Sequence, residues 1–230
     1  MKTSIVIPAH NEEKNISYVL RDILKLGMVS EIIVVDDHSQ DKTYQVVKQI
    51  SRDCPQIKII QRKGDKKGMG VSLRQGTRAA NGEIIIWVMA DRSDDIGTTP
   101  LIIEKIQNGY DLVFASRYMP GGSTGDLNYI KAFFSRSYSF VCKILFGFNV
   151  NDITNAFRGF KKKVFLEINP ESDDFTISPE LSIKAQLKGF KLAEIPTVYS
   201  NRKAGRNNFN IFKMGLRYIS LFQYRFRHNL

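Results

Sequence analysis

Residues 84–95 read IIIWVMADRSDD, and residues 31–41 read EIIVVDDHSQD. Each stretch is an apolar run of the kind found in buried strands of a parallel sheet, and each ends abruptly in acids. The acids are Asp36, Asp37, Asp91, Asp94 and Asp95. Open α/β sheets bind their ligands beyond the carboxyl ends of the strands, where crowded carboxylates repel one another unless a cation lies among them. The pattern therefore predicts a divalent metal and a phosphate-rich ligand.

Strand-like and helix-like segments alternate around these two runs. The expected strands are 4–8, 32–36, 57–61, 84–89 and 111–115. The expected helices are one capped by Asn11, with apolar residues in helical spacing from Ile16 to Leu24, and the segments 41–52, 69–80 and 99–107. Alternation of this kind predicts parallel strands with right-handed crossovers, that is, an α/β fold with a Rossmann-like sheet over about the first half of the chain.

The pattern changes after Arg117. A loop, MPGGSTGDLN, precedes an aromatic-rich helix at 129–147. An extended piece at 156–168, a helix at 179–188, a strand at 191–199 and a final helix from about Phe209 are expected to follow. With 230 residues, of which 43% are hydrophobic, the chain can bury the core of a single domain. We divide it into a ligand-binding half, 1–117, a second half, 118–200, and a basic, aromatic segment, 201–230.

The sequence gives no sign of export or of a membrane span. Cys54 and Cys142 are too few for a disulfide framework, so a reducing compartment is expected. The N-terminus, MKTSIVIPAH, has an apolar burst too short for a signal peptide. No uncharged run approaches the roughly 18 apolar residues that a spanning helix requires. We therefore expect a cytoplasmic protein that does not cross a bilayer unaided.

The net charge is +11, and the positive charge is concentrated near the C-terminus. From Ile195 onward there is no Asp or Glu, whereas basic and aromatic residues interleave. They are Tyr199, Arg202, Lys203, Arg206, Phe209, Phe212, Lys213, Arg217, Tyr218, Phe222, Tyr224, Arg225, Phe226 and Arg227. This composition favours a membrane surface or anionic lipid. Single-stranded nucleic acid and a merely solvated basic face are the alternatives.

Several motifs carry a family resemblance. In chain order they are IVIPAHNEEKNI, VVDDHSQDKT, KKGMGVSLRQGTRAANGE, MADRSDD, ASRYMPGG, TNAFRGFKKKVF and ELSIKAQLKGFKLAEIP. Together they resemble the family 2 glycosyltransferases, most closely the polyprenyl-phosphate (dolichol-phosphate) mannose and glucose synthases. The resemblance implies a GT-A fold, GDP-mannose or UDP-glucose as donor, Mg²⁺ or Mn²⁺, inversion at the anomeric carbon, and a polyprenyl phosphate acceptor at the cytoplasmic membrane face.

The resemblance also implies where the nucleotide sugar binds. The positions are Pro8, Ala9, Asn11, Glu12, Asp37, Gly68, Ala90 and Asp91. A carboxylate such as that of Asp37 suits ribose hydroxyls and base N–H donors. Helix capping is the structural alternative for Asn11 and Glu12. Gly68 and Gly70 precede a helix and would let backbone N–H groups approach phosphate, although a tight turn explains the two glycines equally well.

Asp91 matches the second carboxylate of the family's metal-binding DxD motif. Met89 occupies the first position of that motif and is a poor ligand for Mg²⁺ or Mn²⁺. Ser93, Asp94 and Asp95 are candidates to compensate, directly or through water. Capping of the following helix is the alternative for Asp94.

The resemblance implies that the acceptor phosphate binds near Arg117, Lys131, Ser135 and Arg202. It also implies that Asp91, Arg117 and Arg202 are the catalytic residues. Lys131 stands where the family usually has Arg, so the charge remains but bidentate geometry is lost. No histidine is a convincing general base, and a phosphate acceptor requires none because its second pKa is near 6. Asn155, Arg158 and Glu180 match positions at or behind the sugar pocket, with packing as the alternative.

The sequence thus predicts an inverting, metal-dependent hexosyltransferase that is peripheral on the cytoplasmic face of a membrane, held there by its own surface or by an anchoring partner protein. Two alternatives remain. One is a family 2 transferase acting on a hydroxyl acceptor in polysaccharide or glycoprotein synthesis. The other is a nucleotide-sugar-binding protein without catalysis, which the methionine in the DxD motif makes conceivable. Nucleic acid is not an expected partner.

Overall fold

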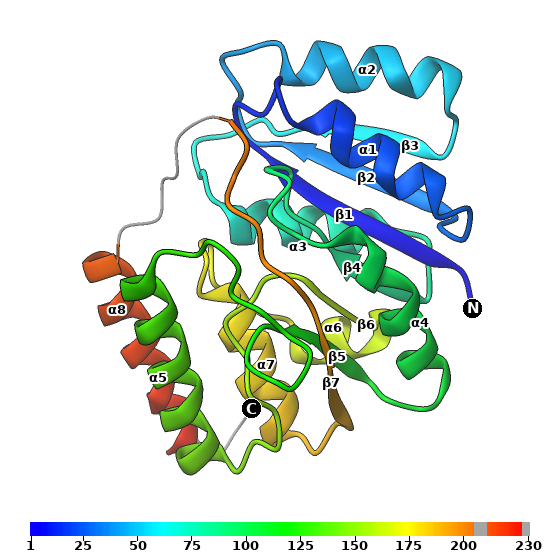
Figure 1. Cartoon of the computed structure of the whole chain (residues 1–230). Coiled ribbons are helices and arrows are strands. Elements are labelled where there is room, and N and C mark those ends of the chain that lie inside the picture. The colour runs from blue at the N-terminus through cyan, green and yellow to red at the C-terminus, as the bar shows by residue number, and fades with distance from the viewer. Residues whose placement is uncertain (205–210, 227–230) are drawn as a thin grey trace.

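A computed structural model describes residues 1–204 and 211–226 and shows one twisted sheet with helices on both faces (Figure 1). The strands are β1 (Thr3–Ala9), β2 (Glu31–Asp36), β3 (Ile57–Gln61), β4 (Ile84–Trp87), β5 (Leu112–Ser116), β6 (Arg158–Lys161) and β7 (Leu192–Pro196). The helices are α1 (Ile16–Lys25), α2 (Thr43–Asp53), α3 (Met69–Ala79), α4 (Thr99–Gln107), α5 (Tyr129–Phe146), α6 (Lys162–Ile168), α7 (Ile177–Leu187) and α8 (Ile211–Ser220). Two short 3-10 turns, η1 (Ile96–Thr98) and η2 (Leu221–Arg225), complete them.

The sheet is mostly parallel, as the alternating pattern predicts. Its strand order is β3-β2-β1-β4-β6-β5-β7. β6 is the exception, because it runs antiparallel to both of its neighbours, β4 and β5. It enters the sheet from the second half of the chain, so the two sequence halves share one sheet.

Side chains from both faces of the sheet are buried, which explains the uninterrupted apolar runs. Val6, Ile33 and Trp87 point to the face covered by α3, α5, α6 and α7. Ile5 and Ile32 point to the opposite face, which α1, α2 and α4 cover. A strand covered on both sides has no solvent-facing positions, so polar residues appear only where it ends. The ends of β2 and β4 are therefore the places where the acids begin.

Two local predictions are wrong. Asn11 does not cap a helix, because α1 begins at Ile16 and Asn11 lies in the preceding loop with φ 57°. Asn tolerates this left-handed conformation, and its side-chain oxygen accepts a hydrogen bond from Gln40 N at 2.7 Å. The piece at 156–168 is extended only in β6 and continues as α6, because its buried apolar residues recur on one helical face. These residues are Val164, Phe165 and Ile168.

The final helix, α8, lies beside α5 (Figure 1). Tyr138 of α5 donates to the carbonyl of Tyr218 at 3.0 Å and stacks on Phe222 with ring centroids 5.4 Å apart. Leu221 and Tyr224 are buried in the core. The C-terminal aromatics therefore divide between core packing and an exposed side.

Five of the basic and aromatic residues named near the C-terminus have side chains that the structure does not describe. Arg206, Phe209 and Arg227 lie outside the described residues, as do the side chains of Phe212 and Lys213. Among the helices that the structure describes, none has both the length and the apolarity needed to cross a membrane.

Candidate functional site

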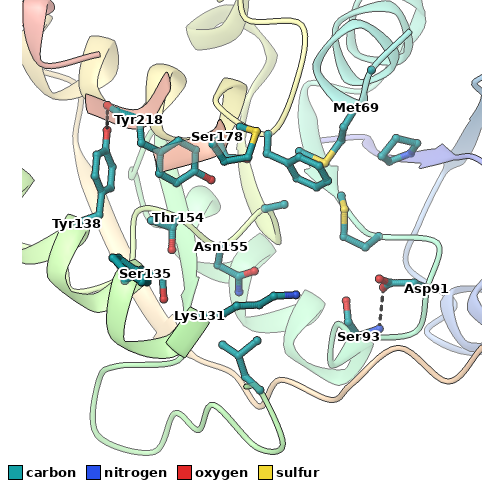
Figure 2. A pocket seen from close by; sticks show the side chains of 18 of the residues that line it. Met69, Asp91, Ser93, Lys131, Ser135, Tyr138, Thr154, Asn155, Ser178 and Tyr218 are labelled. Atoms are coloured by element: carbon teal, nitrogen blue, oxygen red, sulfur yellow. Dashed lines mark hydrogen bonds between the residues drawn. The ribbon is translucent and has the colours of Figure 1, made fainter. Parts of the chain in front are cut away.

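A cavity of about 1140 Å³ opens at the carboxyl ends of the central strands and extends to α5 and α8 (Figure 2). Most of the site residues that the sequence predicts line it; the exceptions are Asn11, Gly70, Asp95, Arg158 and Glu180. Among those that line it are Pro8, Ala9, Glu12, Asp37, Gly68, Ala90, Asp91, Ser93, Asp94, Arg117, Lys131, Ser135 and Arg202. The loops after β1, β2 and β4 form one end, and the aromatic helices form the other.

Asp37 is held rigidly at the β2 end of the cavity. Its carboxylate accepts a hydrogen bond from Gly68 N at 2.7 Å, contacts His38 Nδ1 at 2.9 Å and forms an ion pair with Arg62. The Arg62 guanidinium also donates to the carbonyl of Lys66. This arginine was missed at the sequence level, although its position directly after β3 is a signal. Asp37 can therefore meet a polar ligand without reorganising.

Gly68 and Gly70 make room for protein rather than for phosphate. A Cβ on Gly70 would lie 2.2 Å from the carbonyl oxygen of Ser172, and one on Gly68 would lie 2.2 Å from that of Asp173. The Gly70 N–H donates to the Asp173 carbonyl at 2.9 Å. The backbone N–H groups of Gly68 and Gly70, which the sequence suggested for phosphate binding, are thus hydrogen-bonded within the protein. Glycine is needed at both positions because the loop before α7 approaches the backbone closely.

Asp91 and Asp94 differ in their surroundings although both line the cavity. Asp91 accepts from Ser93 N at 3.1 Å (Figure 2). Asp94 accepts from Met89 N at 2.7 Å, and desolvation of its carboxyl group raises its pKa to about 7. The capping alternative for Asp94 is wrong, because Asp95 accepts from Gly97 N at 3.1 Å at the start of η1.

The side chains around Asp91 offer few ligands for a divalent cation. Among residues 1–204 and 211–226, no three His, Cys, Asp or Glu side chains come together in a way that would hold a metal. Asp91 supplies one carboxylate, the Ser93 hydroxyl lies nearby, and the thioether of Met89 is too soft for Mg²⁺ or Mn²⁺. These residues fit a hard cation only if a bound diphosphate supplies further oxygen ligands.

Arg202 connects the two acidic loops. Its guanidinium pairs with Glu12, and its Nε lies 3.4 Å from Asp91 Oδ2. Burial raises the pKa of Glu12, and this outweighs the opposing effects of its bond from Asn15 Nδ2, at 2.7 Å, and of Arg202. The segment after β7 therefore crosses the ends of β1 and β4 (Figure 1) and brings a cation against two carboxylates.

Arg117 is at the cavity, but it is also half of a buried ion pair. Its Nε and Nη2 donate to the two carboxylate oxygens of Asp152 at 2.7 and 3.0 Å, and Nη2 also donates to Thr154 at 3.0 Å. Burial alone would raise the pKa of Asp152, but the guanidinium outweighs it and holds that pKa below its usual value. Sequence reasoning missed Asp152, which lies two residues before the start of the TNAFRGFKKKVF motif at Thr154.

The first turns of α5 supply Lys131 and Ser135. Asn128 caps this helix by accepting from Ile130 N at 3.0 Å. The Lys131 side chain points across the cavity toward Asp91 and Ser93 in Figure 2. Ser135 is hydrogen-bonded to the hydroxyl of Tyr118. The first turn of α5 therefore directs the Lys131 side chain toward the loop that carries Asp91.

Asn155, Arg158 and Glu180 take different places. Asn155 lines the cavity and donates to the Ala115 carbonyl at 2.8 Å. Arg158 is fully buried and donates to the Ser178 carbonyl at 2.7 Å; burial lowers its pKa to about 9. Glu180 accepts from Ser172 N at 2.8 Å and from Lys184 at 2.6 Å. Arg158 and Glu180 therefore have the packing role that was the alternative, because they stabilise the walls behind the cavity.

The same architecture occurs in solved structures. Glucosyl-3-phosphoglycerate synthase from Mycobacterium tuberculosis, in complex with Mg²⁺ and uridine diphosphate, superposes with a TM-score of 0.74 at 17% identity, covering 97% of this chain and 79% of the other. Its complex with Mn²⁺, uridine diphosphate and phosphoglyceric acid gives a TM-score of 0.71 at 19% identity over 97% and 78%. The α/β sheet with its flanking helices is thus a GT-A fold, as expected.

Sequence comparison gives closer relatives. The chain is 30% identical over 214 residues to a dolichol-phosphate mannosyltransferase of Pyrococcus furiosus, covering 90% of this chain but only 59% of the relative. It is 24% identical over 215 residues to a polyprenol monophosphomannose synthase of Mycolicibacterium smegmatis, covering 89% of this chain and 79% of the relative. The profile of glycosyl transferase family 2 matches residues 4–168. The chain therefore belongs to glycosyl transferase family 2, as its motifs indicated.

Proposed function

We propose that this chain transfers a hexose, mannose or glucose, from GDP- or UDP-sugar to a polyprenyl phosphate, with inversion and with Mg²⁺ or Mn²⁺. The observation that carries the proposal is the single cavity that joins Asp37 and Asp91 to Lys131, Arg117 and the apolar helix pair. An anionic, hydrophobic acceptor needs such a combination of cations and apolar surface. The names of the sequence relatives support a polyprenol phosphate acceptor, and the fold neighbours with bound uridine diphosphate support a nucleotide-sugar donor.

The chemistry requires placement more than proton transfer. A terminal oxygen of the ionised acceptor phosphate attacks the anomeric carbon while the bond from that carbon to the nucleotide diphosphate breaks, which inverts the configuration. Lys131 and Arg202 orient two anions that would otherwise repel each other, and Asp91 fixes the position of the cation site. A divalent cation bound there would neutralise the leaving diphosphate as a Lewis acid.

Neither His10 nor His38 offers a general base for a hydroxyl acceptor. His10 Nδ1 lies 2.6 Å from the carbonyl oxygen of Asp37, and His38 contacts the Asp37 carboxylate, so both belong to the donor end. A hydroxyl acceptor calls for a general base near its oxygen, whereas an ionised phosphate does not. We propose that the protein acts on the cytoplasmic face of a membrane, because the names of its sequence relatives point to a lipid phosphate acceptor. Residues 1–117 supply most of the donor end, 118–200 the acceptor end, and 201–230 the link to the membrane.

Lys131→Ala is expected to raise the KM for polyprenyl phosphate by about 10-fold, because one charge-assisted contact to the acceptor is lost. The affinity for the nucleotide should not change. Lys131→Arg is the matched control and should keep near wild-type transfer. Transfer kinetics with a short polyprenyl phosphate and calorimetry with GDP and UDP separate the two effects. An equal loss of nucleotide affinity in Lys131→Ala would move this lysine to the donor side.

Met89→Asp is expected to bind Mn²⁺ at least about 10-fold more tightly in the presence of nucleotide diphosphate, because a second carboxylate joins Asp91. Without metal the added acid should lower the melting temperature, since it crowds the other carboxylates. Met89→Leu controls for the loss of the thioether. Paramagnetic titration of Mn²⁺ measures the affinity directly. Unchanged Mn²⁺ affinity in Met89→Asp would show that the metal does not bind at this motif.

A further inference from the structure

The segment that follows β7 is hydrogen-bonded to two loops at the cavity. In the loop before α5, the Ser123 carbonyl accepts from Tyr199 N at 3.0 Å. In the loop after β4, the Ser93 carbonyl accepts from Ser200 N at 3.0 Å. Figure 1 shows this segment, in orange, leading from β7 toward the ends of β1 and β4. It therefore joins the loop before α5 to the loop that carries Asp91.

Asp126 and Asn201 form two hydrogen bonds with each other at the end of this contact. Asn201 N donates to Asp126 Oδ1 at 2.6 Å, and Asn201 Nδ2 donates to the Asp126 carbonyl at 2.7 Å. Each residue thus uses one backbone group and one side-chain group, which fixes the position and the direction of one chain segment against the other. Both residues are exposed, and hydrogen bonds that compete with water add little stability. The pair therefore calls for a role other than stabilisation of the fold.

The backbone beside Asp126 is shaped for close approach of the two segments. Gly125 has φ 50°, and a Cβ on it would lie 2.0 Å from the carbonyl oxygen of Tyr199. Only glycine fits this position, because the contact leaves no room for a side chain. The Gly125 N–H donates to Ser123 Oγ at 3.0 Å, which holds the turn before Asp126. The Asp126–Asn201 pair thus continues an approach that the backbone already makes.

Each residue of the pair stands close in the chain to a basic residue of the proposed acceptor site. Arg202 directly follows Asn201. On the other segment, α5 begins at Tyr129, shortly after Asp126, and carries Lys131 in its first turn. Both basic side chains line the cavity. A shift of one chain segment against the other would therefore change the separation of the two cations.

We propose that Asp126 and Asn201 are positioning residues, which hold Arg202 and Lys131 at the separation that a phosphate acceptor requires. Neither Asp126 nor Asn201 is among the residues that line the cavity, so they act through the two cations and not on the substrate. Placement of this kind matters because an error of about 1 Å can lower a rate by as much as about 10²-fold. The proposal rests on the proposed function, in which the two basic residues bind the acceptor phosphate.

The first test is the kinetics of transfer to a short polyprenyl phosphate by the double variant Asp126→Ala, Asn201→Ala. Its KM for this acceptor should rise at least about 10-fold, because both side-chain groups that join the segments are lost. Its affinity for GDP and UDP, measured by calorimetry, should stay within about 2-fold of wild type, and so should its kcat. A purely structural role would instead lower kcat through loss of folded protein and leave KM unchanged, and this result overturns the proposal.

Two single variants are the matched controls. Asp126→Asn keeps a side-chain oxygen that can accept from Asn201 N, so its KM should stay within about 2-fold of wild type. Asp22→Ala removes an exposed carboxylate that pairs with Lys25 and does not line the cavity, and it should transfer like the wild type. A rise of KM in Asp126→Asn as large as in the double variant would assign the effect to charge instead of hydrogen bonding and would overturn the proposal.

Amide hydrogen exchange tests the pair without any substrate. In the double variant the N–H of residue 201 loses its acceptor, so the peptide 197–204 should exchange at least about 10-fold faster than in the wild type. In Asp126→Asn it should exchange as in the wild type. Unchanged exchange in the double variant overturns the proposal. Wild-type protein that transfers nothing to polyprenyl phosphate contradicts the proposed function instead, and exchange in this peptide then decides whether the pair holds the segment that carries Arg202.

Discussion

Asp91→Asn is expected to lower the rate of hexose transfer by at least about 10²-fold, the scale on which removal of one electrostatic stabiliser acts. The amide keeps the size of the side chain and can still accept the hydrogen bond from Ser93 N. It loses the charge that faces the cavity and Arg202. The melting temperature should therefore stay near that of the wild type while metal-dependent turnover is lost. Kinetics with saturating donor, with and without Mn²⁺, measure the effect.

Asp95→Asn is the matched control for that experiment. Asp95 lies four residues away, is exposed and caps η1 through Gly97 N, a role that Asn also fills. Its activity should remain within about 2-fold of wild type, since a surface cap contributes only to stability. Full activity in Asp91→Asn at an unchanged melting temperature would remove Asp91 from the mechanism. A loss in both variants would point instead to a general effect of charge at this loop.

The sheet could be predicted because local patterns determine it. The strands β2 and β4 are apolar on both faces, and their lengths and flanking acids mark where the cavity opens. β6 could not be placed, since its antiparallel insertion between β4 and β5 depends on contacts with distant parts of the chain. The same applies to α6, whose short apolar pattern reads equally well as an extended segment.

The candidate site could be predicted to the extent that its residues follow strands or match family motifs. The partners of those residues could not. Arg117 and Asp152 are separated by 35 positions, and the carbonyl that fills the space beside Gly68 belongs to Asp173, far along the chain. Such pairings leave no periodic pattern in the sequence. They decide whether a basic side chain can bind a ligand or is used in an ion pair that stabilises the fold. For Arg117, the effect of a substitution on stability must therefore be measured as well as its effect on transfer.

Arg117→Ala is expected to lower the free energy of unfolding by about 3–5 kcal/mol, because it leaves the buried carboxylate of Asp152 without its partner. Both side chains are almost fully excluded from solvent, so screening does not reduce the effect. Arg117→Lys keeps the charge but not the bidentate contact, so its free energy of unfolding should fall less than that of Arg117→Ala. Denaturant unfolding at neutral pH measures both variants. Wild-type stability in Arg117→Ala would show that the pair contributes nothing to the folded state.

The pH dependence of the free energy of unfolding identifies why Arg117→Ala loses stability. Since the folded-state pKa of Asp152 is lowered, its contribution is present above the ordinary pKa of an aspartate, near 4, and is lost as the pH falls through the lower folded value. The stability gap between wild type and Arg117→Ala should therefore narrow in acid, because protonation removes the unpaired charge. A gap that is constant from neutral pH to about pH 3 would assign the loss to packing instead. In either case, reduced transfer by Arg117→Ala reports on the proposed acceptor site only after the loss of folded protein has been subtracted. Lys131 is therefore the cleaner probe of that proposed site.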